Sequence, residues 1–339
     1  MKCIPTEEAV GHVLCHDMTQ IIPGQFKGPR FRKGHIVTAE DIPVLLSMGK
    51  EHLYVWEMAE GMVHENDAAE RMAALCGRTN MVWSAVKEGK IELTAACDGL
   101  FRLDAQRLLA VNSQDEVMIA TRKGNTAVRQ GDKLAGTRVI PLVVSEETLR
   151  RAETAAGPQP LMEVLPWRAK TAVIVATGSE VKKGLIQDTF TPVVKDKLSA
   201  FGIKTVRVLY SGDGVENIAA AIRDARAKRP DMVLCTGGMS VDPDDNTPGG
   251  IKASGARIVS YGAPVLPGAM FLLGYFEDGT VICGLPGCVM YAGATIFDLL
   301  LPRMAAGVEI TRADITAYGE GGLCLGCAVC RWPDCSFGK

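Results

Sequence analysis

The stretch DMVLCTGGMSVDPDDNT, from Asp231 to Thr247, decides the fold of the larger part of the chain. It opens with the apolar run Met232 to Cys235, which is typical of a short strand buried on both faces. A glycine pair that favours a tight turn comes after Thr236, followed by a hydroxyl and several acids: Gly237, Gly238, Ser240, Asp242, Asp244, Asp245 and Asn246. Helical patterns flank the strand, so we expect these residues at its carboxyl end, where open α/β sheets bind ligands. An acidic surface loop without a ligand is the alternative.

Two more apolar runs end in loops of the same kind. The run Thr171 to Thr177 leads into TGSE, and the run Val281 to Leu285 leads into GLPGC. Capped helical patterns lie between them: Asp188 precedes one helix, and Asp213 with Glu216 has capping-box spacing before another. Strands that alternate with helical crossovers predict a three-layer α/β/α sandwich. A last long helix is expected to begin near Val289.

The order of the loop motifs resembles that of a known family. TGSE, IQDT, TGGMS with Asp245, and GLPG follow one another as in the molybdopterin-binding domain of molybdenum-cofactor biosynthesis proteins, which include bacterial molybdopterin molybdotransferase and gephyrin. The resemblance covers about residues 168 to 310. It implies a pocket for molybdopterin or its adenylylated form, with molybdate as the other substrate and molybdoenzyme apoproteins as recipients.

A phosphorylated pterin has definite chemical needs. Its phosphate requires backbone amides or hydroxyl groups, and its flat ring requires donors, acceptors and little steric bulk. Helix N-termini after Asp188 and Cys288 would add positive dipole ends. The cofactor-binding candidates are therefore Thr177, Gly178, Ser179, Asp188, Thr236, Gly237, Gly238, Ser240, Gly284, Pro286, Gly287 and Cys288.

The acids suggest a cation. In the family, the position of Asp245 is an acid associated with Mg²⁺ and molybdate, so the resemblance implies a catalytic role for Asp245, with Glu180 beside it. A carboxylate next to a phosphate is repelled unless a cation bridges the two, which favours Mg²⁺ at Asp245 with Asp242 or Asp244 sharing it. Solvated turn acids are the alternative.

Two positions depart from the family pattern. Ser179 stands where molybdotransferases usually have the aspartate of TGDE, so one metal-binding carboxylate is missing. Cys288 stands where they have the asparagine of GLPGNP. A thiol at a helix N-terminus should have a lowered pKa, whereas a small buried cysteine is the plainer interpretation.

The remaining chain divides into smaller regions. We expect an α+β module at residues 1–57, a β-rich module resembling a barrel-sandwich hybrid, with its linker, at 58–160, the molybdopterin-binding domain at 161–318, and a cysteine-rich tail at 319–339. The glycines between Tyr318 and Gly322 predict a flexible hinge, so few core contacts should depend on the tail.

The tail carries Cys324, Cys327, Cys330 and Cys335 with the spacing C-x2-C-x2-C-x4-C. Four thiols within twelve residues at a glycine-rich chain end have no packing rationale, and the spacing is close to that of bacterial ferredoxins. An iron–sulfur cluster is the first hypothesis. A Zn²⁺ ion with four thiolate ligands and a disordered redox-active tail are the alternatives.

Composition limits the function. The 339 residues carry a formal net charge of −2, which gives no electrostatic support to a nucleic-acid partner. Neither a leader sequence nor a membrane-spanning run is evident, so we expect a cytoplasmic protein. We also expect it to form a homo-oligomer. Two functions remain open: an enzyme that inserts molybdate into molybdopterin with Mg²⁺, and a non-catalytic carrier or redox sensor of the cofactor that uses the same pocket.

Overall fold

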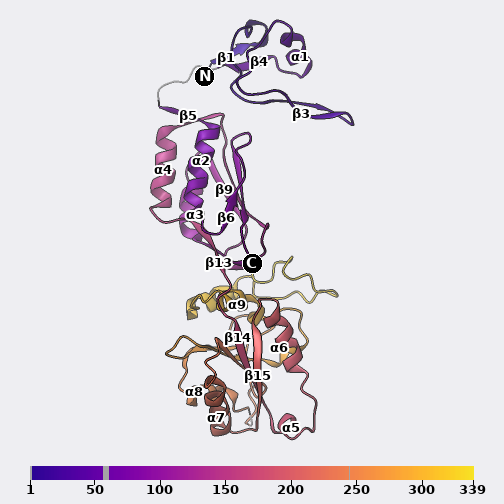
Figure 1. Cartoon of the computed structure of the whole chain (residues 1–339), viewed down its shortest axis with the longest axis vertical. Helices are drawn as coiled ribbons and strands as arrows, with labels where there is room; N and C mark the ends of the chain where they lie inside the picture. Colours follow the sequence, from indigo (N-terminus) through magenta and orange to yellow (C-terminus); the bar gives the residue numbers. More distant parts are fainter. Residues whose placement is uncertain (1, 56–60, 244) are drawn as a thin grey trace. The chain divides into compact units, whose positions relative to one another are not determined.

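The computed structural model describes residues 2–55, 61–243 and 245–339 (Figure 1). The chain forms two compact units. The first comprises residues 1–96, 103–122 and 131–163, and the second comprises residues 97–102, 123–130 and 164–339. The expected boundary at 57/58 falls within residues 56–60, outside the described part of the chain.

The second unit is built on a six-stranded sheet with the order β15-β14-β16-β19-β18-β17. Four strands run parallel, namely β15 (Lys204–Ser211), β14 (Thr171–Thr177), β16 (Met232–Thr236) and β19 (Val281–Leu285). β18 (Leu272–Tyr275) and β17 (Arg257–Tyr261) complete the sheet as antiparallel neighbours. The strands predicted at 171–177 and 281–285 have the expected bounds, because continuous apolar runs between turns leave little choice of register.

Both faces of the sheet are covered by helices, which confirms the three-layer α/β/α architecture (Figure 1). Alternate residues of β14 point to opposite sides: Ile174 packs with α6 (Phe190–Ser199) and α9 (Ile296–Ala305), and Val175 packs with α7 (Val215–Arg226) and α8 (Thr247–Ala253). A side-chain period of two in a strand buried on both faces requires this division.

Shorter elements complete this unit. They are α5 (Ser179–Lys182), the 3-10 turns η2 (Gly287–Met290) and η3 (Ala317–Gly319), and α10 (Arg312–Thr316). A three-stranded sheet of the order β10-β8-β13 pairs β10 (Thr126–Val128), β8 (Gly99–Leu103) and β13 (Met162–Pro166). The expected module 58–160 therefore contributes strands to both units.

In the first unit, residues 61–96, 103–122 and 131–163 combine helices with a sheet. The four-stranded sheet β6-β7-β11-β9 consists of Met81–Trp83, Lys90–Ala95, Lys133–Val139 and Val117–Thr121. The helices are α2 (Glu65–Cys76), α3 (Ala105–Asn112) and α4 (Glu146–Ala156), and β5 (Met62–His64) pairs with β12 (Val143–Ser145). Asp104 caps α3, so the module that was expected to be β-rich combines helices with its strands.

The N-terminal residues form a small α+β module, as expected. β1 (Lys2–Pro5) pairs with β4 (His52–Val55), and β2 (Met18–Ile22) pairs with β3 (Phe26–Phe31). The 3-10 turn η1 (Thr6–Glu8) and α1 (Asp41–Ser47) lie between these strands in the sequence. Leu14, Leu45 and Leu53 are almost fully buried and form the centre of its small core.

Two expectations about the end of the chain are wrong. The last long helix begins at Ile296 rather than near Val289, because Thr295 and Asp298 form a capping box that sets its first turn. The tail is also packed rather than hinged: Phe337 is 3% exposed in the core of the second unit. Leu266 accepts a backbone hydrogen bond from Cys324 and donates one to Gly322, which ties the start of the tail to the domain.

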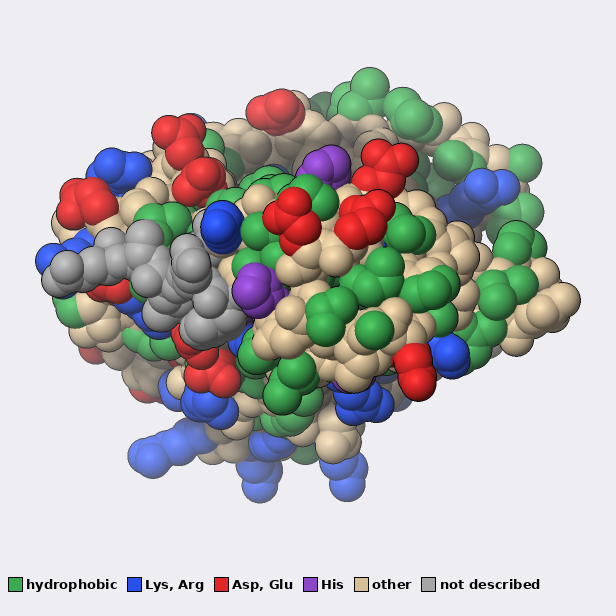
Figure 2. All heavy atoms as spheres, turned by 90° about the horizontal axis from the view of Figure 1, so that it is seen from above, with side chains coloured by type: hydrophobic (Ala, Val, Ile, Leu, Met, Phe, Trp, Pro, Cys, Tyr) green, Lys and Arg blue, Asp and Glu red, His purple; other side chains and the backbone are tan. Residues whose placement is uncertain are grey.

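Two general features concern the helices and the charge of the surface. No helix among the described residues has the length and apolar character that crossing a membrane requires. On the face shown in Figure 2, acidic, basic and hydrophobic side chains lie interspersed. This mixed face agrees with the low net charge of the sequence.

Candidate functional site

Three loops predicted to bind the cofactor lie at one edge of the sheet. β16 lies between β14 and β19, with Ala176 opposite Thr236 and Thr236 opposite Leu285 at the strand ends. The chain moves from β14 to β15 on one side and reaches β16 on the other, so the strand order reverses between β14 and β16. Ligands of open α/β sheets bind at such a point, outside the carboxyl ends of the strands.

The glycine pair after β16 has a structural cause. Gly237 and Gly238 both have positive φ angles, of 84° and 55°. A Cβ on Gly237 would lie 2.4 Å from the carbonyl oxygen of Thr177, and a Cβ on Gly238 would lie 2.8 Å from Oγ1 of Thr247. The close approach of these protein atoms is therefore sufficient to require glycine at both positions.

A buried hydroxyl pair holds this turn. Oγ1 of Thr177 donates to the carbonyl oxygen of Thr236 at 3.0 Å and lies 2.9 Å from Oγ1 of Thr247. Both threonines are at least 94% buried, so their hydroxyl groups stabilise the turn from within the protein. Sequence reasoning missed Thr247; its place directly after Asn246, at a helix start, was the available signal.

The third loop contains one packed glycine and one open glycine. A Cβ on Gly284 would lie 2.5 Å from Sδ of Met239, so this glycine lets the turn after β16 pack against β19. Gly287 is different, because no heavy atom lies within 4 Å of a Cβ built there. Gly287 differs from the other glycine candidates in two respects taken together: a Cβ there would face open space, and its φ angle is not positive.

The first loop is tied to the loop after β15. The amide of Ser179 donates to Oδ2 of Asp213 at 3.2 Å, and the amide of Asp213 points back to Oγ of Ser179 at 3.5 Å. The expected capping box at Asp213 and Glu216 is therefore wrong: Gly214 is the N-cap of α7, and no side-chain bond caps it. Because Asp213 binds the neighbouring loop, sequence spacing alone could not reveal its partner.

Several amides after β16 have no protein partner. Within the described part of the chain, the backbone amides of Gly238, Met239 and Ser240 donate to no other residue. The side chain of Ser240 is exposed beside them. Successive unpaired amides in a tight turn form a concave site with positive polarity, which suits a phosphate group.

The acids of this edge are spread over two loops. Asp245 is half-buried, whereas Asp242 and Glu180 are exposed, and Asp244 lies outside the described residues. Tyr261 lies near Asp245: burial raises the pKa of its phenol, and the negative charge of Asp245 adds to this rise. No group of three or more histidine, cysteine or acidic side chains suited to a metal occurs among the described residues.

Asp188 caps α6, as its position predicted. Its Oδ1 accepts hydrogen bonds from the amides of Phe190 and Thr191, at 3.0 and 2.9 Å. Tyr210 of β15 lies close by, and burial followed by the charge of Asp188 raises the pKa of its phenol. The carboxylate of Asp188 is therefore engaged within the protein, which leaves it less available to a ligand.

Cys288 differs from the expectation. It lies in η2, a single 3-10 turn, and α9 begins eight residues later at Ile296. Burial raises the pKa of its thiol, and the nearby carboxylate of Asp298 adds to the rise. The predicted lowering of this pKa is wrong, because no helix N-terminus faces the sulfur and the turn partly buries it.

Among the described residues, no three of the tail cysteines come together as a group suited to a metal. Cys324, Cys327 and Cys330 are exposed, and Cys335 is partly buried. Cys330 nevertheless touches the third loop, since a Cβ on Gly293 would lie 2.5 Å from its Sγ. Part of the cysteine segment thus packs against the connection between η2 and α9.

Comparison with known proteins gives different matches for different regions of the chain. Residues 173–306 match the family model described as a probable molybdopterin binding domain, and residues 3–57 match a domain of unknown function, DUF8806. A molybdopterin molybdenumtransferase from Staphylococcus epidermidis is 23% identical over 84% of this chain and 66% of its own length. A CinA-like protein from Thermosipho melanesiensis is 36% identical over 23% of this chain and 19% of its own length.

The chain thus spans less than two thirds of the length of both curated relatives. Among solved structures, the molybdopterin biosynthesis enzyme MoaB from Thermus thermophilus is 19% identical with a TM-score of 0.35, over 40% of this chain and 91% of that structure. The matched segment contains β14, β16 and β19 with all three of their loops. Residues 173–306 of this chain therefore belong to the family of probable molybdopterin binding domains.

Proposed function

We propose that this protein binds molybdopterin, or its adenylylated form, at the carboxyl ends of β14, β16 and β19 and inserts molybdate into it. The observation that carries the proposal is the row of unpaired amides from Gly238 to Ser240, which lies where the strand order reverses. A phosphate can accept hydrogen bonds from these amides and from the hydroxyl of Ser240. The open space at Gly287 would then receive the flat ring.

Asp245 is the residue that would make the site catalytic. It is the less exposed of the two described acids in its loop, and Glu180 projects from the neighbouring loop. Mg²⁺ commonly takes one or two carboxylates together with substrate phosphates and waters, and this donor set fits that pattern. When bound, Mg²⁺ would neutralise phosphate and molybdate oxygens; Asp245 and Asp242 would hold it beside them.

The alternative function is a carrier or sensor of the cofactor. It rests on Ser179, where molybdotransferases usually have an acid, and on the tail cysteines, which suit an iron–sulfur cluster or Zn²⁺ by their donor chemistry. The contact of Cys330 with Gly293 brings this segment to the loop that follows Gly287. Recipients would then be apo-molybdoenzymes.

Binding of molybdopterin to the purified full chain tests the proposal. We expect Gly287→Val to weaken binding by about tenfold or more, because a branched side chain would fill the open space. Gly136→Ala is the matched control, since Gly136 of β11 also has room for a Cβ, with only Cε of Lys90 nearby at 3.8 Å. Equal affinity of both folded variants and the parent would show that the pocket lies elsewhere.

A further inference from the structure

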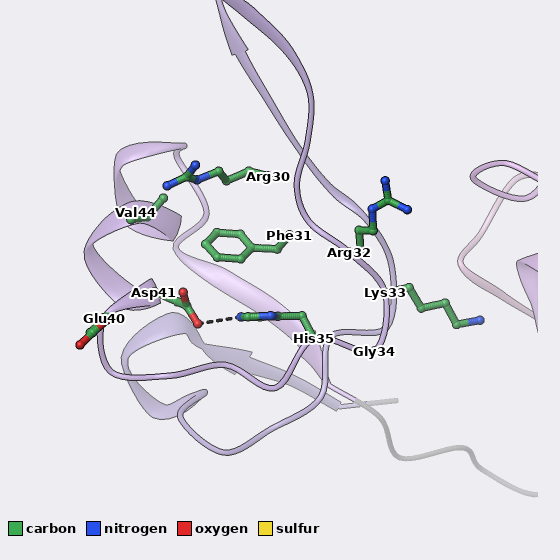
Figure 3. A pocket seen from close by; sticks show the side chains of 9 residues that line it. All are labelled: Arg30, Phe31, Arg32, Lys33, Gly34, His35, Glu40, Asp41 and Val44. Carbon is green, nitrogen blue, oxygen red and sulfur yellow. Dashed lines mark hydrogen bonds and ion pairs between the residues drawn. The ribbon is translucent and has the colours of Figure 1, made fainter.

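A hollow lies in the N-terminal module, which contributes none of the loops described above. It has a volume of about 650 Å³ and is lined by residues of β3, the following turn and α1 (Figure 3). This size is within the range of ligand pockets, roughly 300–1,000 Å³. The residues belong to the segment that matches a domain of unknown function.

A β-bulge directs one side chain of this hollow. Met18 pairs with Phe31 and Thr19 pairs with Pro29, so Arg30 has no partner across the hairpin. Bulges turn side chains from the face that strand alternation would give them, and they are common beside functional sites. Figure 3 shows Arg30 extending over the ring of Phe31 toward Val44, while Arg32 and Lys33 extend to the other side.

Arg30 has no protein partner in the described part of the chain. Its guanidinium group makes no hydrogen bond, ion pair or ring contact there. Opposite charge is available in the hollow from Asp41, but its Oδ2 already accepts from Nε2 of His35 at 2.7 Å and from the amide and hydroxyl of Thr38, both at 2.8 Å. Glu40 is the second acid, and it is exposed at the rim.

Two rings form an aromatic wall beside Arg30. The rings of Phe31 and His35 lie with centroids 5.1 Å apart and planes tilted by 40°. Phe31 is 8% exposed and anchored in the module core, and the hydrogen bond with Asp41 fixes His35. The imidazole of His35, whose side chain is 35% exposed, offers a face for a flat group, with Phe31 packed beside it. The planar guanidinium of Arg30 can pair with two oxygens of a phosphate or carboxylate.

We propose that this hollow binds a small anion in which a phosphate or a carboxylate is carried by a flat ring. Arg30 binds the anionic group, and the ring lies against the exposed face of His35. Glu40 at the rim accepts a hydrogen bond from an amino group where the ring carries one. None of its lining residues belongs to the pterin loops, and the proposal does not depend on the assignment of those loops.

Calorimetric titration of the full chain tests this proposal with four probes: AMP, nicotinate, adenosine and inorganic phosphate. We expect AMP, nicotinate or both to bind with a Kd below about 1 mM, and adenosine and phosphate to bind at least about tenfold more weakly. AMP alone would identify phosphate as the anionic group, and nicotinate alone would identify carboxylate. Adenosine binding as tightly as AMP would overturn the proposal.

Three variants locate the site. Arg30→Gln should weaken binding of the probe about tenfold, and Lys27→Gln, which changes an exposed cation of β3 that does not line the hollow, should change it by less than about twofold. Equal losses in both would show unspecific charge attraction and overturn the proposal. So would probe binding that survives Arg30→Gln but is lost in Gly287→Val, since the probe would then occupy the pterin loops. Failure of all four probes to bind at millimolar concentration also contradicts it.

Discussion

The hydroxyl of Thr177 lies 2.9 Å from the hydroxyl of Thr247, seventy residues later in the chain. This contact joins the end of β14 to the first turn of α8 and encloses the turn that carries Gly237 and Gly238. It is completely internal, since both side chains are buried. The conformation of the loop after β16 therefore depends on the end of β14.

We predict that Thr177→Val destabilises the protein by about 1–3 kcal/mol, because the carbonyl of Thr236 and the hydroxyl of Thr247 would lose a buried partner. Urea unfolding measures the change. The double variant Thr177→Val/Thr247→Val should lose less than the sum of the two single variants, as expected for residues in contact. Strictly additive losses would mean that the two hydroxyl groups act independently.

Asp245→Asn should separate binding from turnover. The amide keeps the size of the side chain but removes the charge that would hold Mg²⁺, so molybdate insertion should fall on the order of 100-fold. Molybdopterin affinity should change by less than about threefold, since the phosphate is held by amides. Asp196→Asn, an exposed acid on α6, is the control and should behave as the parent does.

Two other results would change the functional assignment. Normal insertion by Asp245→Asn would eliminate the catalytic role of this residue. If the parent protein itself inserts no molybdate but still binds molybdopterin, the carrier function is favoured.

The tail cysteines should bind one metal centre when the protein is purified without oxygen. A brown protein with several irons is expected for an iron–sulfur cluster, and a colourless one with a single zinc is expected for the alternative, since Zn²⁺ has a filled d shell. Cys324→Ser/Cys327→Ser should abolish metal binding, whereas Cys3→Ser, an exposed cysteine at the other end of the chain, should not. Equal metal content in both variants would contradict a tail site.

Deletion of the tail is a poorer test than these substitutions. Truncation after Glu320 removes Phe337, a core residue that is 3% exposed, and a lost buried phenylalanine costs about 3–5 kcal/mol. It also removes the backbone bond from Cys324 to Leu266. A truncated chain would therefore lose metal and stability together.

Stability at low pH should depend on Asp314. Burial opposes ionisation of this carboxyl, but hydrogen bonds from Arg303 and Thr311 outweigh it and lower the pKa to about 2, from an ordinary value of 3.8. A lowered folded-state pKa means stability that is present above about pH 3.8 and is lost as the pH falls toward 2. Allowing for partial exposure, the contribution is about 1–2 kcal/mol.

Urea midpoints at pH 5, 3.5 and 2.5 measure this effect. Asp314→Asn should be less stable than the parent at pH 5, and the difference should shrink as the pH falls. A difference that stays constant over this range would show that Asp314 acts through its hydrogen-bonding shape and not through its charge.

The local pattern of the sequence determined the strands that carry the three loops and the presence of the helices α6 and α7. Continuous apolar runs between turn residues predicted β14 and β19 with their observed bounds. Such elements depend on neighbours two to four residues away, which a sequence displays directly. The three-layer sandwich followed from their order.

Tertiary contacts decided what the loops do. The spacing of Asp213 suggested a helix cap, but Asp213 binds Ser179, and the room at Gly237 is taken by Thr177. Cys288 was expected at a helix N-terminus, but the capping box of Thr295 sets the start of that helix at Ile296.

The tail is a second case in which the local sequence did not show the tertiary contacts. Its glycines suggested a hinge, but Phe337 finds a place in a core assembled from residues far away in the sequence. Polar and apolar groups at loop ends are satisfied by whichever partner the folded chain brings near, and that partner is set by three-dimensional packing. The sequence determined the framework and the kinds of residues at its edge; only the tertiary structure decided which of them remain free for a ligand.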